Sequence, residues 1–301
     1  MQKINNLLTN KENLNNELKK SFLEAKKDEK FLTLINKLNM SDDILMKYTN
    51  LLMDSADEYH NCANCKGLLE CQNKITGHAL LPIKNEFAID FKYIACKYQK
   101  KYVKESSYLK NIYAINIPEN ILSARMKDIY TKDTSRFETI KYLKQFIDNP
   151  KEVKGLYLHG NFGSGKTYLI AAALCELARK NVKSAIVFWP EFLKNLKTLF
   201  NTKEFDEVMN KVMKAPILLI DDIGAENSTA WSRDEVLCPI LQYRMDEHLA
   251  TFFTSNLNLI ELETHLSITK DGADIVKAKR IIERVKQLTN DLEMISKNLR
   301  K

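Results

Sequence analysis

Apolar residues recur at helical spacing through residues 1–60, a stretch with no glycine and no proline. One series covers residues 4–22 and a second covers residues 31–38, and Ser41 can cap a further helix that continues to Leu52. This pattern predicts a small helical bundle that packs its own core. The alternative is that one of its helices leaves an apolar face open for a protein partner.

Short apolar runs alternate with amphipathic stretches from Pro118 onward. The runs predict strands at residues 155–159, 184–189, 216–222, 250–256 and 292–296. The amphipathic stretches predict helices at residues 136–147, 168–178, 191–200, 204–214, 233–248 and 275–288. The run at 216–222 is apolar on both faces, as a central parallel strand is. Strands separated by helices predict a parallel sheet with right-handed crossovers.

A basic stretch with two tyrosines, Lys97–Lys104, follows an expected strand at residues 87–95. We interpret it as a solvated helix face that leads into a linker, and the alternative is contact with nucleic acid. The sequence therefore predicts a helical N-terminal domain over residues 1–105, a linker over residues 106–118 and an α/β domain over residues 119–301.

Composition places the chain among globular proteins of the cytoplasm. Its 301 residues are 45% hydrophobic and 28% charged, and no apolar run approaches the ~20 residues of a membrane span. Residues 1–10 lack the apolar core of a signal peptide, so we expect a cytoplasmic protein with no membrane partner. The net charge of +7 allows an anionic partner without requiring one. In that compartment the six cysteines favour metal binding or buried thiols over disulfides.

Cysteines cluster in the stretch after the helical bundle and predict a zinc site there. Cys62 and Cys65 form a C-x-x-C pair, the local half of such a site, and Cys71, His78 and Cys96 follow within reach. A tetrahedral site takes four ligands, and we choose Cys62, Cys65, His78 and Cys96, with Cys71 in reserve. The alternatives are a redox pair or unrelated buried thiols, but no βαβ pattern surrounds the pair and the cysteines are clustered. Because all four ligands would be protein side chains, the zinc ion would be structural.

The stretch Gly160–Thr167, GNFGSGKT, matches the Walker A phosphate-loop pattern between an expected strand and an expected helix. Its glycines let backbone N–H groups curl around phosphate oxygens. We expect Lys166 to reach the β- and γ-phosphates of ATP or ADP and the Thr167 hydroxyl to bind Mg²⁺. The expected nucleotide-binding residues of the loop are Gly160, Asn161, Phe162, Gly163, Ser164, Gly165, Lys166, Thr167 and Tyr168.

A second motif lies about fifty residues later, where four apolar residues are followed by Asp221 and Asp222. Alone, this run would be a strand that ends in a turn, but after a Walker A loop it predicts a Walker B strand. Ligands bind at the carboxyl ends of parallel strands. We therefore expect Asp221 to hold the Mg²⁺ shell and Asp222 to orient or deprotonate the attacking water. Asn256, at the end of the next expected strand, can sense the γ-phosphate.

The segments GNFGSGKT, ILLIDDIG, FTSN and KRIIERV occur in the order and spacing of AAA+ ATPases of the initiator and helicase-loader branch. Together with the N-terminal cysteine module, they make nearly the whole chain similar to bacterial loaders of the replicative helicase. The resemblance implies an AAA+ ATPase domain, a parallel sheet flanked by helices, preceded by a helical zinc-binding domain. It implies that the N-terminal domain binds the hexameric helicase ring. The ATPase domain would bind ATP and single-stranded DNA and self-associate.

The resemblance also assigns roles to single residues. It makes Asn256 the sensor 1 residue, and it implies an arginine that completes the active site of a neighbouring subunit. Arg284 matches that arginine best and Arg280 second, while Arg300 is a weak candidate for sensor 2. Most AAA+ members carry Glu at the position of Asp222, and the shorter side chain suits slow, Mg²⁺-dependent hydrolysis of the kind a switch needs.

These expectations favour a helicase loader, an ATP-controlled assembly factor that acts on another protein ring. The first alternative is a transposition-helper ATPase of the same branch, which assembles on DNA but does not as a rule carry a helical and zinc-binding module of this size. The second is a zinc-dependent DNA-binding regulator that only holds ATP. That reading requires a strong basic recognition element, and none stands out beyond Lys97–Lys104.

Overall fold

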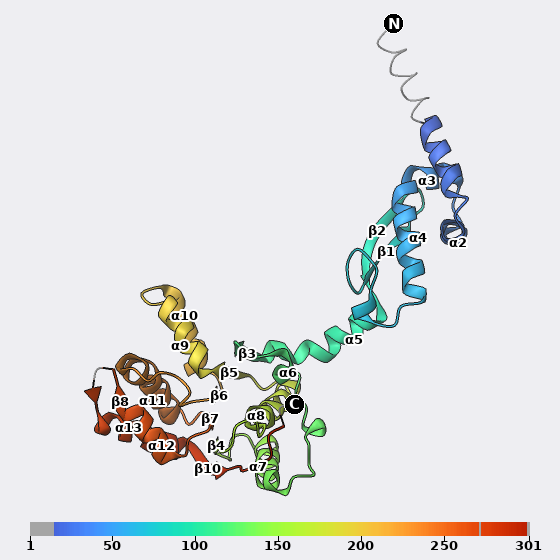
Figure 1. Cartoon of the computed structure of the whole chain (residues 1–301). Coiled ribbons are helices and arrows are strands. Elements are labelled where there is room, and N and C mark those ends of the chain that lie inside the picture. The colour runs from blue at the N-terminus through green and yellow to red at the C-terminus, as the bar shows by residue number, and fades with distance from the viewer. Residues whose placement is uncertain (1–14, 271, 300–301) are drawn as a thin grey trace. The chain divides into compact units, whose positions relative to one another are not determined.

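The computed structural model describes residues 15–270 and 272–299. The expected apolar positions before residue 15, and the sensor 2 candidate Arg300, lie outside these residues. Contacts divide the chain into two compact units, Met1–Ser106 and Ser107–Lys301. Figure 1 shows both units.

Helices surround the core of the N-terminal unit. Its elements are a helix at residues 15–25, α2 (Glu29–Leu38), α3 (Asp42–Leu45), η1 (Met46–Tyr48), α4 (Thr49–Ala63), η2 (Leu68–Glu70), β1 (His78–Lys84), β2 (Ile89–Ala95) and α5 (Lys97–Ser106). The buried core consists of Phe22, Ala25, Phe31, Leu34, Ile35, Leu45, Leu52, Ala56 and Ile89. The predicted helical bundle is therefore confirmed. The helix expected from Ser41 to Leu52 is interrupted at η1, and the Ser41 side chain makes no capping hydrogen bond.

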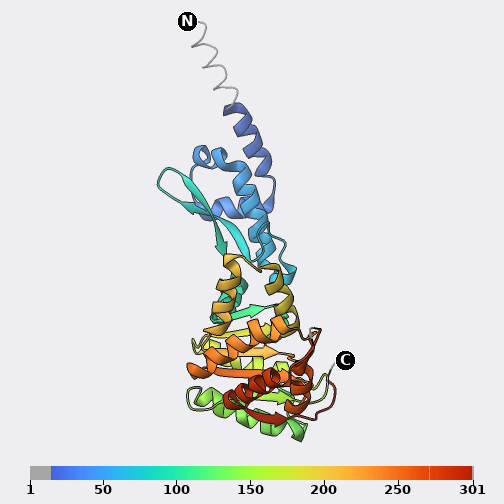
Figure 2. The ribbon, with the colours of Figure 1, turned by 90° about the vertical axis from the view of Figure 1, so that its left-hand side faces the viewer.

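A two-stranded antiparallel sheet completes this unit. The expected strand at residues 87–95 is confirmed as β2, and it pairs with β1, which the sequence analysis did not predict. Figure 2 shows the pair beside α4, where Ser55 donates to the Leu80 carbonyl at 2.6 Å and Glu58 accepts from the Leu80 N–H at 2.6 Å. The register places His78 opposite Ala95, so the hairpin brings His78 close to Cys96.

A six-stranded parallel sheet organises the C-terminal unit, in the order β10-β4-β7-β6-β5-β3. Its strands are β3 (Ile112–Ile115), β4 (Gly155–His159), β5 (Ser184–Phe188), β6 (Ile217–Asp221), β7 (Ala250–Ser255) and β10 (Thr289–Glu293). Every neighbouring pair runs parallel, which confirms the predicted parallel sheet. β4, which precedes the phosphate loop, lies between β10 and β7.

Helices cover both faces of this sheet. Leu156 and Leu158 of β4 pack with α7 (Phe137–Asp148) and α8 (Lys166–Arg179) on one face. Tyr157 points to the other face, because successive strand residues alternate. That face carries α9 (Trp189–Thr198), α10 (Lys203–Met213), α11 (Cys238–Asp246), α12 (Leu259–Ser267) and α13 (Ile275–Leu288). Figure 1 shows α9 and α10 projecting as a pair from this unit.

Short elements connect the larger ones. They are η3 (Ser107–Asn111), α6 (Glu119–Leu122), η4 (Met126–Asp128), η5 (Thr134–Arg136), the π-helical turn η6 (Trp231–Leu237) and the small hairpin β8 (Ile268–Thr269) and β9 (Gly272–Ala273). Among the residues that the structure describes, no helix combines the length and apolarity needed to cross a membrane.

Three expectations for this unit need correction. The segment expected as a linker, residues 106–118, contains the edge strand β3, which pairs with β5 from Ile112↔Ser184 onward. The closing strand expected at 292–296 is β10, which begins three residues earlier because it pairs with β4 from Thr289↔Gly155. The helix expected at 233–248 is divided into η6 and α11.

Candidate nucleotide-binding site

The phosphate loop connects the carboxyl end of β4 to the amino end of α8. Positive φ angles of 137°, 70° and 87° occur at Gly160, Gly163 and Gly165, and residues with a Cβ rarely adopt such angles. A Cβ at Gly160 would also overlap the backbone carbonyl of Met294. Gly165 occupies the cap position of α8, so backbone N–H groups of the loop and of the first helical turn face the same space.

Lys166 is folded back onto its own loop. Its side chain is 8% exposed, and its ammonium donates to the carbonyls of Gly160 at 2.9 Å and Asn161 at 2.8 Å. A third hydrogen bond, of 2.9 Å, reaches the Asn256 side-chain oxygen at the end of β7. The ammonium therefore lies at the phosphate loop, where three oxygens accept its hydrogen bonds.

Asp221 accepts hydrogen bonds from two hydroxyl groups. Thr167 of α8 and Thr254 of β7 each donate to Asp221 Oδ1 at 2.6 Å. Burial raises the pKa of Asp221, and these two hydrogen bonds act in the opposite direction. The Thr167 hydroxyl and the Asp221 carboxylate are oxygen donors of the kind that Mg²⁺ prefers, so the residues present fit that ion.

Asp222 is held in an unusual backbone conformation beside Asp221. Its φ angle is 58°, in the left-handed region that Asn and Asp tolerate better than most residues. Its N–H donates to Thr254 Oγ1 at 2.9 Å, and its Oδ1 accepts from Asn256 Nδ2 at 3.2 Å. The structure thus brings together Lys166, Thr167, Asp221, Asp222 and Asn256, the predicted polar residues of the site.

Thr254 was not predicted as a site residue, although it belongs to the segment FTSN that ends at Asn256. Its contact with Asp221 depends on the register of β7 against β6, which residue types in order along the chain do not reveal. Among the other loop residues, Phe162 is 72% exposed and Ser164 is buried with its hydroxyl bonded to the Asn161 carbonyl. Tyr168 packs against the core between α8 and the sheet.

The C-terminal tail, residues 294–299, lies along the phosphate loop. Met294 N–H donates to the His159 carbonyl at 2.8 Å, and Leu299 N–H donates to the Gly163 carbonyl at 2.9 Å. Between them the Ser296 hydroxyl donates to Asp133 at 2.7 Å. The hydroxyls of Ser135 and Ser296 hold the pKa of Asp133 well below its usual range. Residues 294–296 were expected to belong to the closing strand, but β10 ends at Glu293, and the contacts of the tail with the phosphate loop were not predicted.

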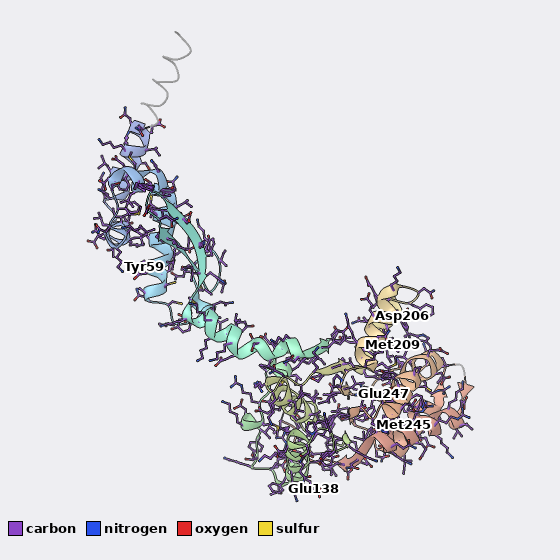
Figure 3. The ribbon with its side chains drawn as sticks, turned by 180° about the vertical axis from the view of Figure 1, so that it is seen from behind. Tyr59, Glu138, Asp206, Met209, Met245 and Glu247 are labelled. Carbon is purple, nitrogen blue, oxygen red and sulfur yellow. The ribbon has the colours of Figure 1, made fainter. Side chains whose placement is uncertain are left out.

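Arg280 and Arg284 lie on α13, and the groove that they line includes no residue of the phosphate loop. The predicted apolar stripe of this helix is confirmed as buried: Ala278, Ile281, Ile282, Val285 and Leu288. Arg280 is exposed, and Arg284 donates to the Cys238 sulfur at 2.7 Å. Both arginines line a surface groove of about 400 Å³, as does Met245 of α11, which Figure 3 labels.

The five candidate zinc ligands line one pocket of about 330 Å³ in the N-terminal unit. Burial raises the pKa of the Cys62 thiol, a hydrogen bond from Asn73 lowers it, and the nearness of Cys96, Cys65 and Cys71 raises it. Cys71, which we had held in reserve, therefore lies with the chosen cysteines.

The sulfur atoms in this pocket already have hydrogen-bond partners. Cys71 Sγ accepts from the Gly77 N–H at 3.3 Å, and Cys96 Sγ accepts from the Gln99 N–H at 3.4 Å. His78 Nδ1 lies 3.1 Å from the Thr76 carbonyl. Thiols and an imidazole are the donors that zinc prefers. Within residues 15–270 and 272–299, however, no group of three or more such side chains is arranged to hold a metal ion, so zinc binding stays a prediction.

The basic stretch Lys97–Lys104 forms most of α5. None of the residues of α5 is buried, in agreement with the interpretation of a solvated helix.

Comparisons with known proteins add to this geometry. A family model described as the bacterial DnaA ATPase domain matches residues 134–268. The replicative helicase loader DnaI of Bacillus subtilis (strain 168) is 35% identical over 264 residues, which cover 85% of this chain and 84% of the relative. The alignment is longer than the whole C-terminal unit, Ser107–Lys301, so the similarity must extend into the N-terminal unit.

Two solved structures share the fold. A crystal structure of DnaI is 41% identical and covers 64% of this chain and 99% of its own, with a TM-score of 0.56. The structure of a putative primosome component from Streptococcus pyogenes serotype M3 is 34% identical, covers 65% of this chain and 100% of its own, and has a TM-score of 0.55. The resemblance drawn from the sequence motifs is thereby confirmed. The chain belongs to the DnaI family of replicative helicase loaders, which are AAA+ ATPases.

Proposed function

We propose that this protein is an ATP-dependent loader of the replicative DNA helicase, acting when replication initiates or restarts. One observation carries the proposal: a chain similar to DnaI over most of its length holds Lys166, Thr167, Asp221, Asp222 and Asn256 in one hydrogen-bonded site. A transposition helper, the alternative, shares such a site. The likeness to a helicase loader that extends into the N-terminal unit favours loading.

The nucleotide would bind with its phosphates in the loop between β4 and α8. Lys166 would exchange the carbonyls of Gly160 and Asn161 for phosphate oxygens, since both are acceptors for the same ammonium. Thr167 and Asp221 would hold Mg²⁺, which supplies charge neutralisation at the β- and γ-phosphates when bound.

Hydrolysis would depend on Asp222 and Asn256. The Asp222 carboxylate would orient the attacking water or take its proton, and Asn256 would sense the γ-phosphate through the same amide that now joins Lys166 to Asp222. The short side chain of Asp222 supports slow hydrolysis, which suits a switch. Arg284, or Arg280 one turn earlier, would complete the site of a neighbouring subunit once chains self-associate.

The N-terminal unit would bind the hexameric helicase. Tyr59 of α4, labelled in Figure 3, is among its exposed large side chains, as are Leu51 and Met53 on the same helix. A structural zinc ion would be held by Cys62, Cys65, His78 and Cys96, with Cys71 as the reserve ligand. Single-stranded DNA would bind the ATPase unit.

The first test is nucleotide binding by the full chain. Lys166→Ala should weaken Mg·ATP binding about tenfold or more, because a charged hydrogen-bond donor to the phosphates is lost. Lys183→Ala is the matched control: Lys183 is exposed and precedes β5 at the amino-terminal edge of the sheet. Equal affinities for the two variants would refute this assignment of the nucleotide site.

A further inference from the structure

Beyond the point where the ladder of β6 and β7 stops, further hydrogen bonds, most of them from side chains, join the ends of the two strands. The parallel register of these strands ends at Ile220↔Phe253. Beyond it the β6 chain turns away at Asp222, whose left-handed conformation is incompatible with a continued ladder. Polar groups in the turn at residues 221–223 therefore need hydrogen-bond partners outside the ladder, because the site is largely buried.

Two consecutive residues of β7 supply those partners. The Thr254 hydroxyl donates to Asp221 Oδ1 at 2.6 Å and accepts from the Asp222 N–H at 2.9 Å. The Thr254 carbonyl accepts from the Ile223 N–H at 3.0 Å, and the Ser255 hydroxyl donates to the Ile223 carbonyl at 2.6 Å. Three successive residues of the turn are thus each bonded to β7.

The position of the Thr254 hydroxyl is fixed by these bonds. A hydroxyl carries one hydrogen, and here that hydrogen points to Asp221 while a lone pair receives the Asp222 N–H. The side chain is 1% exposed, so bulk water has no access to replace either bond. One oxygen atom therefore sets both the direction of the Asp221 carboxylate and the backbone of Asp222.

We propose that Thr254 is a positioning residue for ATP hydrolysis, which aligns the metal-holding Asp221 and the water-orienting Asp222 through one hydroxyl. This role rests on the proposed ATPase function and deepens it. Asp221 Oδ1 also accepts from Thr167, so Thr254 holds the carboxylate against the residue with which it would share the metal. Without the hydroxyl, Asp221 Oδ1 keeps the bond from Thr167, and the bond from the Asp222 N–H to Thr254 Oγ1 is lost.

The test compares three variants of the full chain. Thr254→Val removes the hydroxyl and keeps the branched shape, and Thr254→Ser restores the hydroxyl. Thr251→Val is the matched control on the same strand. Thr251 is equally buried and its hydroxyl bonds to Arg244 and to the Leu249 carbonyl, away from the nucleotide site.

The primary measurement is the factor by which Mg²⁺ tightens binding of a fluorescent ATP analogue. We expect the Mg²⁺ factor of Thr254→Val to be about tenfold smaller than that of the parent. Binding without Mg²⁺ should stay within about twofold of the parent, because Lys166 is unchanged. The maximal hydrolysis rate should fall at least as much. Thr254→Ser should restore both, and Thr251→Val should lower the thermal midpoint but keep the Mg²⁺ factor.

An unchanged Mg²⁺ factor in Thr254→Val would overturn the role, as would an equal loss in Thr251→Val or a failure of serine to restore it. A parent chain that binds the analogue but never hydrolyses ATP, even with single-stranded DNA and helicase present, would instead refute the proposed ATPase itself.

Discussion

The side-chain amide of Asn256 donates to the carboxylate of Asp222 at 3.2 Å, across the ends of two neighbouring strands. The oxygen of the same amide accepts from Lys166 at 2.9 Å. Asn256 thus joins the cation expected to bind phosphate to the carboxylate expected to act on water. If Lys166 moves to phosphate oxygens as we propose, the Asn256 oxygen would lose this hydrogen bond, and the amide would then report nucleotide binding to Asp222.

Asp222→Asn separates binding from hydrolysis. Asn tolerates the left-handed backbone and can still accept from Asn256, so the site should keep its shape and its Mg·ATP affinity. Without the carboxylate the hydrolysis rate should fall about a hundredfold. Asp206→Asn on α10, an exposed aspartate labelled in Figure 3, is the control. Hydrolysis by Asp222→Asn at the rate of the parent would show that another group positions the water.

Arg284 should act on the nucleotide of a neighbouring subunit. Arg284→Ala assemblies should bind ATP but hydrolyse it about a thousandfold more slowly or worse, the loss typical of an arginine finger. Mixed with Asp222→Asn subunits, they should recover activity, because the Asp222→Asn chains lend an intact arginine to intact carboxylates.

Lys279→Ala provides the control for this experiment, since Lys279 is exposed and lines the same groove. If Arg280→Ala is inactive and Arg284→Ala is not, the assignment moves one turn along α13. Parent rates in both arginine variants would exclude a shared active site.

Zinc content tests the N-terminal unit. Protein purified without chelator should contain one zinc ion per chain by elemental analysis, and Cys62→Ser should lose it and unfold this unit while ATP binding persists. Cys175→Ala, which changes a buried thiol of α8, should keep the zinc. Zinc-free parent protein would refute the site, and loss of ATP binding in Cys62→Ser would show that the two units depend on each other.

The sequence predicted the parts of the fold that depend on local pattern. β6 could be placed because the apolar run at 216–222 is recognisable from consecutive residues. The phosphate loop could be placed in the same way from its closely spaced glycines at 160–165. The edge strand β3 was taken for linker because its four residues form a strand only through pairing with β5, far along the chain. β1 was missed for a different reason, because it contains Pro82 and a proline weakens the strand signal of an apolar run.

The polar site was predictable only in part. Motif spacing placed Lys166, Asp221 and Asn256 at one edge of the sheet. The role of Thr254 depends on the register of β6 against β7, and the contact of Leu299 with Gly163 depends on the path of the tail. Neither follows from residue types in order along the chain.

We propose that this protein places a replicative helicase ring on DNA under control of ATP. The most direct measurement is the amount of hexameric helicase retained on closed circular single-stranded DNA after a high-salt wash, since a closed circle admits no threading from an end. With ATP and the parent chain, the helicase should be retained, and with Lys166→Ala it should not. Equal retention without the chain, or DNA coated by the chain with no helicase recruited, would contradict the claim.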